Sequence, residues 1–297
     1  MPDETKAAML FYAVAICHQT RALKSETLQL FGWEYIEDSF LKLAEINSWL
    51  LDPKAIIHAD LSTIKNALAV AFSDNGLAEQ STLDRLGERS ILMKDTSTLV
   101  LNEADGSFIK LLQQTDSFLI NNGKGYYEIL SKYDTFSDPM RKKSSFLAKL
   151  LMDAGLFSIR DNHHYIPIMD YHMQRVLLRL GCVEVLSESL KKSLQNREPL
   201  PTDAPVRQAC IEAINLISTA SGTAKWQMND YFWTLGRSCC DETTLCHDKH
   251  CAKHPCSFES IISVSDHKHC SFEQQCKGYS DITYRMLREP MVNTHFY

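Results

Sequence analysis

The sequence predicts an all-α fold that ends in a cysteine-rich, metal-binding segment. In several segments apolar residues recur every three or four positions, and prolines, glycines and aspartates lie between these segments, where helices begin and end. Seven of the ten cysteines fall between Cys239 and Cys276. In a reducing compartment such clustering indicates a metal site before it indicates disulfides.

The composition is that of a globular protein with room for one large or two small domains. The chain has 297 residues, of which 44% are hydrophobic and 23% are charged. No apolar run approaches the roughly 20 residues that cross a bilayer, and residues 1–6 lack the features of a secretion signal. We therefore expect a cytoplasmic monomer without a membrane partner.

The charge balance argues against a simple nucleic-acid-binding protein. The formal net charge is -6 and the pI is about 6.0, whereas such proteins usually carry a basic footprint. Residues 141–143, Arg-Lys-Lys, are a candidate basic patch. The field of the whole molecule will nevertheless not attract phosphate strongly.

Helical periodicity recurs along most of the chain. Residues 7–17 are apolar nearly all round, which predicts a buried helix. Residues 97–101 could form a short strand, but we interpret residues 82–101 as helices and loops. Further helices are predicted over residues 35–51, 60–72, 126–133, 183–194, 203–218 and 226–233.

A lysine-rich helix is predicted to follow Asp138, which can cap it, with Pro139 in the first helical position. Gly155 would end this helix. Its lysines, Lys142 and Lys143, lie near the positive end of the helix dipole, where the pKa of an amine is lowered and the neutral form is favoured. The buried stripe of the helix consists of Phe146, Leu147, Leu150 and Leu151.

A second informative helix is predicted between Asp170 and Gly181. Its buried face consists of Met173, Val176, Leu177 and Leu180. Gly181 is a natural C-terminal stop. Asp170 lies in the first turn, where unpaired amide groups and the dipole stabilise its anionic form, so its simplest interpretation is an N-cap.

The segment that starts at Asp170 reads Asp-x-His-x-x-Arg-Val and ends in Leu-Gly. It resembles the catalytic-aspartate segment of the helix-hairpin-helix (HhH-GPD) DNA glycosylases, the superfamily of endonuclease III, adenine glycosylase and the archaeal 8-oxoguanine glycosylases. The resemblance implies base-excision activity on DNA, with Asp170 stabilising positive charge on the sugar as the base leaves. It also implies a two-lobed helical fold: one lobe from residues 1–30 and 180–238, a central lobe from residues 31–179, and a metal-cluster segment over residues 239–297.

Two further segments match the family in the same order along the chain. The triplet His18-Gln19-Thr20 resembles the polar end of an early family helix, which implies that Gln19, with His18 beside it, lines the base site. Lys142 or Lys143 matches the lysine of bifunctional members, which attacks the sugar and forms a Schiff base. The family's Leu-Pro-Gly-x-Gly hairpin, which contacts a DNA phosphate, is absent.

The cysteine segment follows Gly236-Arg237, which resembles the start of the 4Fe-4S cluster of several family members. The resemblance implies Cys240, Cys246, Cys251 and Cys256 as ligands, with Cys239 as the alternative first ligand, although the middle spacing departs from the family pattern. Zinc is the competing cofactor, because thiolates could combine with nearby histidines in one or two tetrahedral sites. Those histidines are His247, His250, His254, His267 and His269. In either case we expect a structural metal, since a closed site has no open position for chemistry.

Three functions are compatible with these observations. The first is an N-glycosylase that removes a modified or damaged base from DNA, with or without lysine lyase activity. The second keeps this chemistry but acts on a free modified nucleoside, a nucleotide or RNA, as the acidic charge and the missing hairpin favour. The third is a non-catalytic nucleic-acid-binding module that is stabilised by metal, in which Asp170 only caps a helix.

Overall fold

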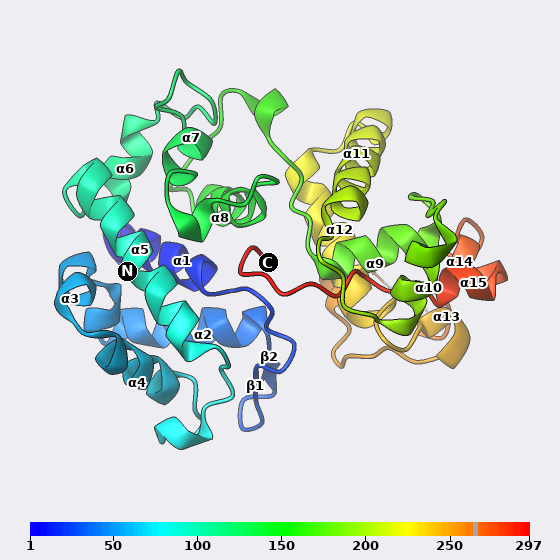
Figure 1. Ribbon diagram of the computed structural model, residues 1–297, viewed down its shortest axis with the longest axis horizontal. Coiled ribbons are helices and arrows are strands. Elements are labelled where there is room, and N and C mark those ends of the chain that lie inside the picture. Colours follow the sequence, from blue (N-terminus) through cyan, green and yellow to red (C-terminus); the bar gives the residue numbers. More distant parts are fainter. Residues whose placement is uncertain (264–266) are drawn as a thin grey trace. The chain divides into compact units, whose positions relative to one another are not determined.

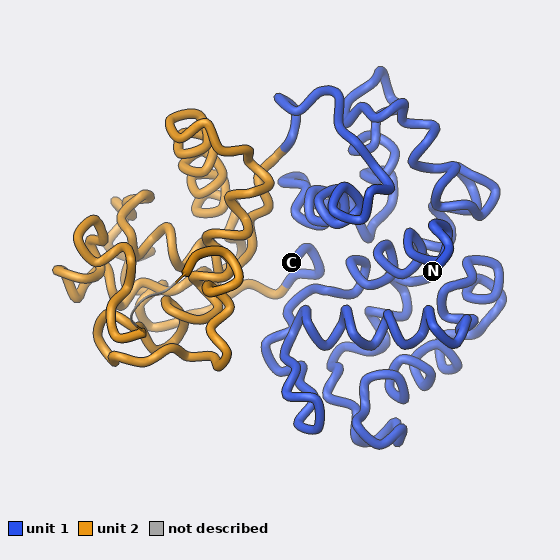
Figure 2. The backbone as a smooth tube through the Cα atoms, turned by 180° about the vertical axis from the view of Figure 1, so that it is seen from behind, with its two compact units in different colours: residues 1–165, 294–297 blue, residues 166–293 orange. Residues whose placement is uncertain are grey.

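The computed structural model describes residues 1–263 and 267–297 and is mostly helical, as the sequence predicts (Figure 1). The chain divides into two compact units (Figure 2). Unit 1 contains residues 1–165 together with residues 294–297, and unit 2 contains residues 166–293. The expected lobe of residues 1–30 and 180–238 is not one of these units, because the first helix packs inside unit 1.

Unit 1 is built around α1 (Asp3–Ala15), in which every residue from position 7 to position 15 is buried, as predicted. This helix contacts α2, α5, α6 and α8. The ring of Phe11 packs against that of Phe108, with 4.9 Å between their centroids. The other elements of unit 1 are β1 (Lys24–Ser25), β2 (Leu30–Phe31), α2 (Trp33–Glu45), η1 (Trp49–Leu51), α3 (Pro53–His58), α4 (Leu61–Ala71), η2 (Ala78–Gln80), α5 (Leu86–Ala104), α6 (Phe108–Gln114), α7 (Tyr126–Leu130), η3 (Asp134–Phe136), α8 (Lys142–Asp153) and η4 (Asn162–His164).

For unit 1, the interpretation of residues 82–101 as helices and loops is confirmed, and the predicted start of the lysine-rich helix needs correction. Residues 97–101 lie within the long helix α5 and form no strand. Helix α8 begins at Lys142 rather than at Pro139, because the Asp138 carboxylate accepts hydrogen bonds from the amides of Met140 (3.0 Å) and Lys142 (2.8 Å). Asp138 therefore closes a turn before the helix, and Arg141 adopts a left-handed conformation (φ 58°) at the junction.

Unit 2 contains α9 (Tyr171–Leu180), α10 (Glu188–Asn196), α11 (Ala204–Ser221), α12 (Lys225–Ser238), α13 (Leu245–Asp248), η5 (Ser257–Ser260), α14 (Lys277–Ser280) and α15 (Ile282–Arg285). Helix α9 packs against α11, α12, α14 and α15. Gly236 permits a close approach of α12 to α9, since a Cβ atom there would lie 2.8 Å from the carbonyl oxygen of His172. Gly181 ends α9 in the left-handed conformation (φ 81°), as predicted.

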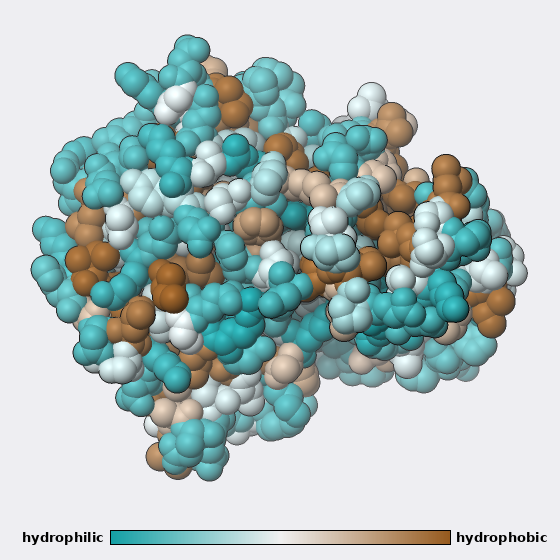
Figure 3. Space-filling model, in the orientation of Figure 1, coloured by the Kyte–Doolittle hydropathy of each residue, from teal (hydrophilic) through white to brown (hydrophobic). Residues whose placement is uncertain are grey.

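Figure 3 shows a face on which small groups of hydrophobic residues alternate with larger hydrophilic areas. In the part of the chain that the structure describes, no helix has both the length and the apolar character that a membrane crossing requires.

Candidate functional site

Polar side chains gather at the C-terminal end of α1 in unit 1. Lys143 Nζ donates a hydrogen bond to the carbonyl oxygen of Ala15 (2.6 Å), and Arg89 Nη1 donates to that of Ile16. Lys142 Nζ lies 3.5 Å from Cys17 Sγ. The last carbonyl groups of a helix lack partners within the helix and carry partial negative charge, so they attract cations.

The Lys143 amine is fully buried, which lowers its pKa to about 7. The positive charges of Lys142 and Arg89 lower the pKa further, while Cys17 and Glu88 oppose the shift. The sequence suggested a lowered pKa because of the dipole of the lysine's own helix; in the structure, burial is the main cause. A substantial fraction of this amine is therefore neutral, and so nucleophilic, at physiological pH.

His18 is also fully buried, and its ring is held neutral. Burial is the largest cause of its low pKa, which lies well below the usual range, and the charges of Lys143, Arg89 and Arg85 contribute. Nε2 lies 3.0 Å from Glu88 Oε1, yet neither ring nitrogen makes a hydrogen bond of good geometry among the described residues. Buried polar groups are normally satisfied, so this ring is suited to a polar group of a bound molecule.

Gln19 follows in a left-handed conformation (φ 46°), which is costly for a residue with a side chain. Its side-chain Oε1 atom accepts a hydrogen bond from Arg85 Nη1 (2.7 Å). Its backbone N–H donates a hydrogen bond to the carbonyl oxygen of Tyr297 (3.2 Å). Arg85 also donates to the carbonyl oxygen of Thr294 (3.1 Å). The C-terminal residues thus help to fix Gln19.

Four residues nominated by the family resemblance therefore lie around one helix end: His18, Gln19, Lys142 and Lys143. We call them the α1-end cluster. The motifs in the sequence identify each of these four residues. No motif identifies Arg85, the residue before α5, or Glu88 and Arg89 within α5, and these three residues surround the cluster.

Asp170 belongs to unit 2 and is the N-cap of α9. One carboxylate oxygen, Oδ1, accepts a hydrogen bond from the amide of Met173 (3.0 Å), and the residue is only 7% exposed. The structural part of the prediction is confirmed. The unpaired amides and the dipole of a helix N-terminus interact favourably with a carboxylate, and a carboxylate is the group that electrostatic stabilisation of a cationic sugar would require.

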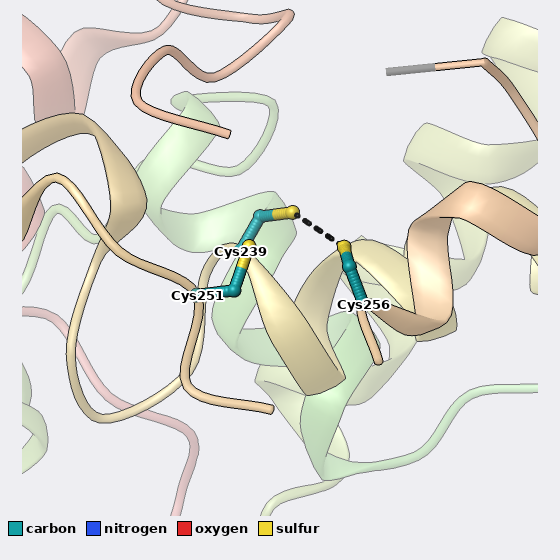
Figure 4. Close-up of side chains that lie close together, drawn as sticks. All are labelled: Cys239, Cys251 and Cys256. Atoms are coloured by element: carbon teal, nitrogen blue, oxygen red, sulfur yellow. Dashed lines mark hydrogen bonds between the residues drawn. The ribbon is translucent and has the colours of Figure 1, made fainter. Parts of the chain in front are cut away.

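Three buried cysteines form a candidate metal centre in unit 2 (Figure 4). The sulfur atoms of Cys239, Cys251 and Cys256 lie within 4.8 Å of one another, and those of Cys239 and Cys256 are 3.7 Å apart. Cys239 follows α12, Cys251 lies in the loop after α13, and Cys256 precedes η5. We call this group the cysteine centre.

The end of α12 organises the loop that carries two of these cysteines. Ser238 accepts a hydrogen bond from the amide of Ala252 through its carbonyl oxygen (2.8 Å) and one from the amide of Ser257 through its hydroxyl (2.8 Å). Burial raises the pKa of the Cys251 thiol to about 11, and Cys256 adds to this shift while a hydrogen bond with Cys239 opposes it. Burial also raises the pKa of Cys239, and there Cys256 and Cys251 add to the shift. A bound metal reverses this preference, because it binds the thiolate and displaces the proton.

The other two cysteines of the expected ligand set lie elsewhere. Cys240 Sγ accepts a hydrogen bond from Arg179 Nη1 (3.6 Å), and Cys246 lies in α13. The predicted set of Cys240, Cys246, Cys251 and Cys256 is thus divided, and Cys239, the alternative first ligand, joins Cys251 and Cys256. The side chains of adjacent residues at a helix end point in different directions. For this reason only one of Cys239 and Cys240 can join Cys251 and Cys256.

A comparison with family models and a comparison with curated proteins both give no match to this chain.

Proposed function

We propose that the protein is an N-glycosylase that cleaves the bond between a modified or damaged base and its sugar in DNA. The observation that carries the proposal is the α1-end cluster, in which a buried amine with a pKa of about 7 lies among the residues that the family motifs nominate. A neutral amine in a water-poor site is a suitable nucleophile for a sugar carbon. If the substrate is duplex DNA, the base must leave the stack to reach the site.

In this mechanism Lys143 Nζ forms a bond to the sugar carbon C1′ while the bond from C1′ to the base nitrogen breaks. The base leaves with the electron pair of that bond and takes up a proton. The attached nitrogen then loses one proton to solvent, and its electron pair forms the C1′=N bond while the bond from C1′ to the ring oxygen breaks. The ring oxygen takes up a proton, which leaves a protonated Schiff base on an open-chain sugar. In unit 1, His18 and Gln19 would hydrogen-bond to the base. The family resemblance assigns the stabilisation of positive charge on the sugar to Asp170, and this assignment is tested by variants of Asp170 alone.

The test is base release from duplex oligonucleotides that each contain one modified base, followed by borohydride reduction to trap the Schiff base. We expect Lys143→Gln to abolish trapping. The matched control is Lys149→Gln in the same helix, whose lysine pairs with Asp153 (2.7 Å) and should be dispensable. Failure of the wild-type protein to release any base from DNA or nucleosides would contradict the proposal and leave the non-catalytic binding module.

One observation favours a second candidate, an N-glycosidase of free modified nucleosides, nucleotides or RNA. The net charge of -6 gives little attraction for a polyanion. The same assay with nucleosides as substrates separates the two. Release from nucleosides that is insensitive to competing duplex DNA would support the second candidate.

We also propose that the cysteine centre binds zinc rather than the 4Fe-4S cluster that the resemblance implies. A tetrahedral site with zinc–sulfur bonds of about 2.3 Å places its sulfurs about 3.8 Å apart, and Cys239 and Cys256 are 3.7 Å apart. In a 4Fe-4S cluster each thiolate binds a different iron, so the sulfurs are spread more widely.

The fourth ligand that we propose is His267. Its Nδ1 atom is buried and has no hydrogen-bond partner in the described part of the chain, while Nε2 lies 2.7 Å from Glu259 Oε1. Histidine ligands of zinc usually donate their other ring N–H to a carboxylate in this way. Glu259 also interacts electrostatically with Cys251. The His267 ring is not within 4.8 Å of all three sulfurs, so its side chain would move towards them when the metal binds. Metal analysis of the purified protein tests the proposal, and iron with a broad visible absorption band would contradict it.

A further inference from the structure

Arg85 joins three separate parts of unit 1 at the α1-end cluster. Its Nη1 atom donates hydrogen bonds to the side-chain Oε1 atom of Gln19 (2.7 Å) and to the carbonyl oxygen of Thr294 (3.1 Å). Its Nε and Nη2 atoms both donate to Glu88 Oε2, at 3.2 Å and 2.7 Å. One guanidinium thus holds together the residues after α1, the C-terminal residues and the first turn of α5.

Arg85 and Gln19 both adopt the left-handed backbone conformation, with φ angles of 51° and 46°. This conformation is costly for a residue with a side chain, so the surrounding contacts must stabilise it. Strained residues of this kind cluster at functional sites. Here a direct hydrogen bond joins two of them across 66 positions of the sequence. The pair is therefore a candidate for a role in the chemistry of the cluster.

The contact with Arg85 fixes the orientation of the Gln19 side-chain amide. A guanidinium has donors and no acceptor, so the Gln19 atom that faces it must be the oxygen. The nitrogen lies on the other branch of the amide group. On that side Gln19 therefore acts as a hydrogen-bond donor.

Glu88 fixes the position of the proton on the His18 ring. Glu88 Oε2 accepts two hydrogen bonds from Arg85, and an ionised carboxylate can only accept. The other oxygen, Oε1, lies 3.0 Å from His18 Nε2. At this distance the oxygen repels a nitrogen lone pair and attracts an N–H group, even where the geometry of the hydrogen bond is poor. The neutral ring therefore carries its proton on Nε2, which leaves Nδ1 as an acceptor.

We propose that Arg85 and Glu88 are positioning residues that hold Gln19 as a hydrogen-bond donor and His18 Nδ1 as an acceptor for the polar edge of the base. The inference rests on the proposed function, in which Gln19 and His18 bind the base. His18 Nδ1 is buried and has no hydrogen-bond partner among residues 1–263 and 267–297, so an N–H group of the base can satisfy it. The base that fits has an edge with both an N–H group and an acceptor.

The proton on His18 is located by long-range 1H–15N NMR spectra of the full chain labelled with 15N-histidine, and no substrate is needed. The signal is identified by its loss in His18→Gln. We expect a neutral ring with its proton on Nε2 and no titration between about pH 5 and pH 8, because burial keeps the ring neutral. A ring with its proton on Nδ1, or with protons on both nitrogens, would overturn the proposal.

Glu88→Gln makes a sharper test, because the side chain keeps its size. The new amide oxygen should face Arg85, so the amide nitrogen would face His18 Nε2 and donate to it. We therefore expect the proton to move to Nδ1, which also identifies the His18 signal should His18→Gln not fold. Glu79→Gln changes an exposed residue of the same unit and should leave the spectrum as in the wild type. A proton that stays on Nε2 in Glu88→Gln would show that Glu88 does not determine its place.

The kinetics of base release test the positioning role. Arg85→Lys keeps the charge but cannot contact Gln19 and Glu88 at once as a guanidinium does. It should lower kcat/KM about 100-fold, mainly through a higher KM, because the base is held less well while Lys143 is unchanged. Arg160→Lys changes an exposed arginine of the same unit and is the control. Wild-type kinetics in Arg85→Lys would overturn the positioning role. A wild type that releases no base would instead contradict the proposed function, and the NMR spectra would still decide the arrangement of protons.

Discussion

Lys143 Nζ, which is fully buried, donates its hydrogen bond to the carbonyl oxygen of Ala15, 128 positions earlier in the chain. This contact joins the start of α8 to the last residue of α1. The fixed amine interacts electrostatically with His18, whose ring nitrogens have no hydrogen bond of good geometry in the described structure. An amine that is partly neutral at pH 7 and a neutral imidazole are thus both held at a helix end that also attracts cations.

If Lys143 is the nucleophile, the rate of Schiff-base trapping should follow the neutral fraction of its amine. The rate should be high above pH 7, half-maximal near pH 7, and about tenfold lower for each further pH unit of acidification. Single-turnover trapping between pH 5 and pH 9 measures this profile. A rate that rises only near pH 10 would indicate a lysine with an ordinary pKa and would exclude Lys143.

Lys143 should also make the stability of the fold depend on pH. Its pKa is about 7 in the folded protein but 10.5 ordinarily, so the unfolded chain binds more protons between these values. The free energy of unfolding therefore rises with pH in this range, by up to about 1.4 kcal/mol per pH unit. Below pH 7 the cost of the buried amine is present in full.

Lys143→Met removes the titrating group but keeps a long side chain. In urea unfolding at pH 7 and pH 9, the variant should lack the increase in stability that Lys143 gives the wild type. If the free energy of unfolding rises equally from pH 7 to pH 9 in the wild type and the variant, the pKa of Lys143 is not lowered in the folded protein. Lys149→Met is the matched control and should retain the wild-type dependence.

Asp170 allows capping and catalysis to be separated, because asparagine caps a helix about as well as aspartate. Asp170→Asn should change the free energy of unfolding by a few tenths of a kcal/mol, whereas Asp170→Ala should cost about 1 kcal/mol. If the carboxylate also stabilises charge on the sugar, both variants should lose base release. Full activity in a stable Asp170→Asn protein would leave Asp170 with the role of a cap only.

Local chemistry explains which parts of the fold the sequence could predict. Helix α9 begins after Asp170 and ends at Gly181 because its cap and its stop are set by single residues. The start of α8 was missed because the Asp138 carboxylate binds amides in a turn instead of the first turn of the helix.

Contacts between distant segments explain what could not be predicted. The main cause of the low pKa of Lys143 is its burial against α1. The sequence around Lys143 contains no feature that predicts this contact. The division of the cysteines has the same origin. A spacing rule groups Cys240 with Cys251 and Cys256, but the fold directs Cys240 towards Arg179 instead.

The proposed fourth ligand of the cysteine centre gives a graded prediction. His267→Ala should remove a ligand and so weaken zinc binding at this centre strongly. Glu259→Gln should weaken zinc binding about 10–100-fold, because this variant keeps the imidazole and loses only the carboxylate that orients it. His269→Ala is the control, because His269 is an exposed histidine that pairs with Glu273 (3.3 Å). Competition with a zinc chelator measures the affinities. Wild-type affinity in His267→Ala would show that another group completes the site.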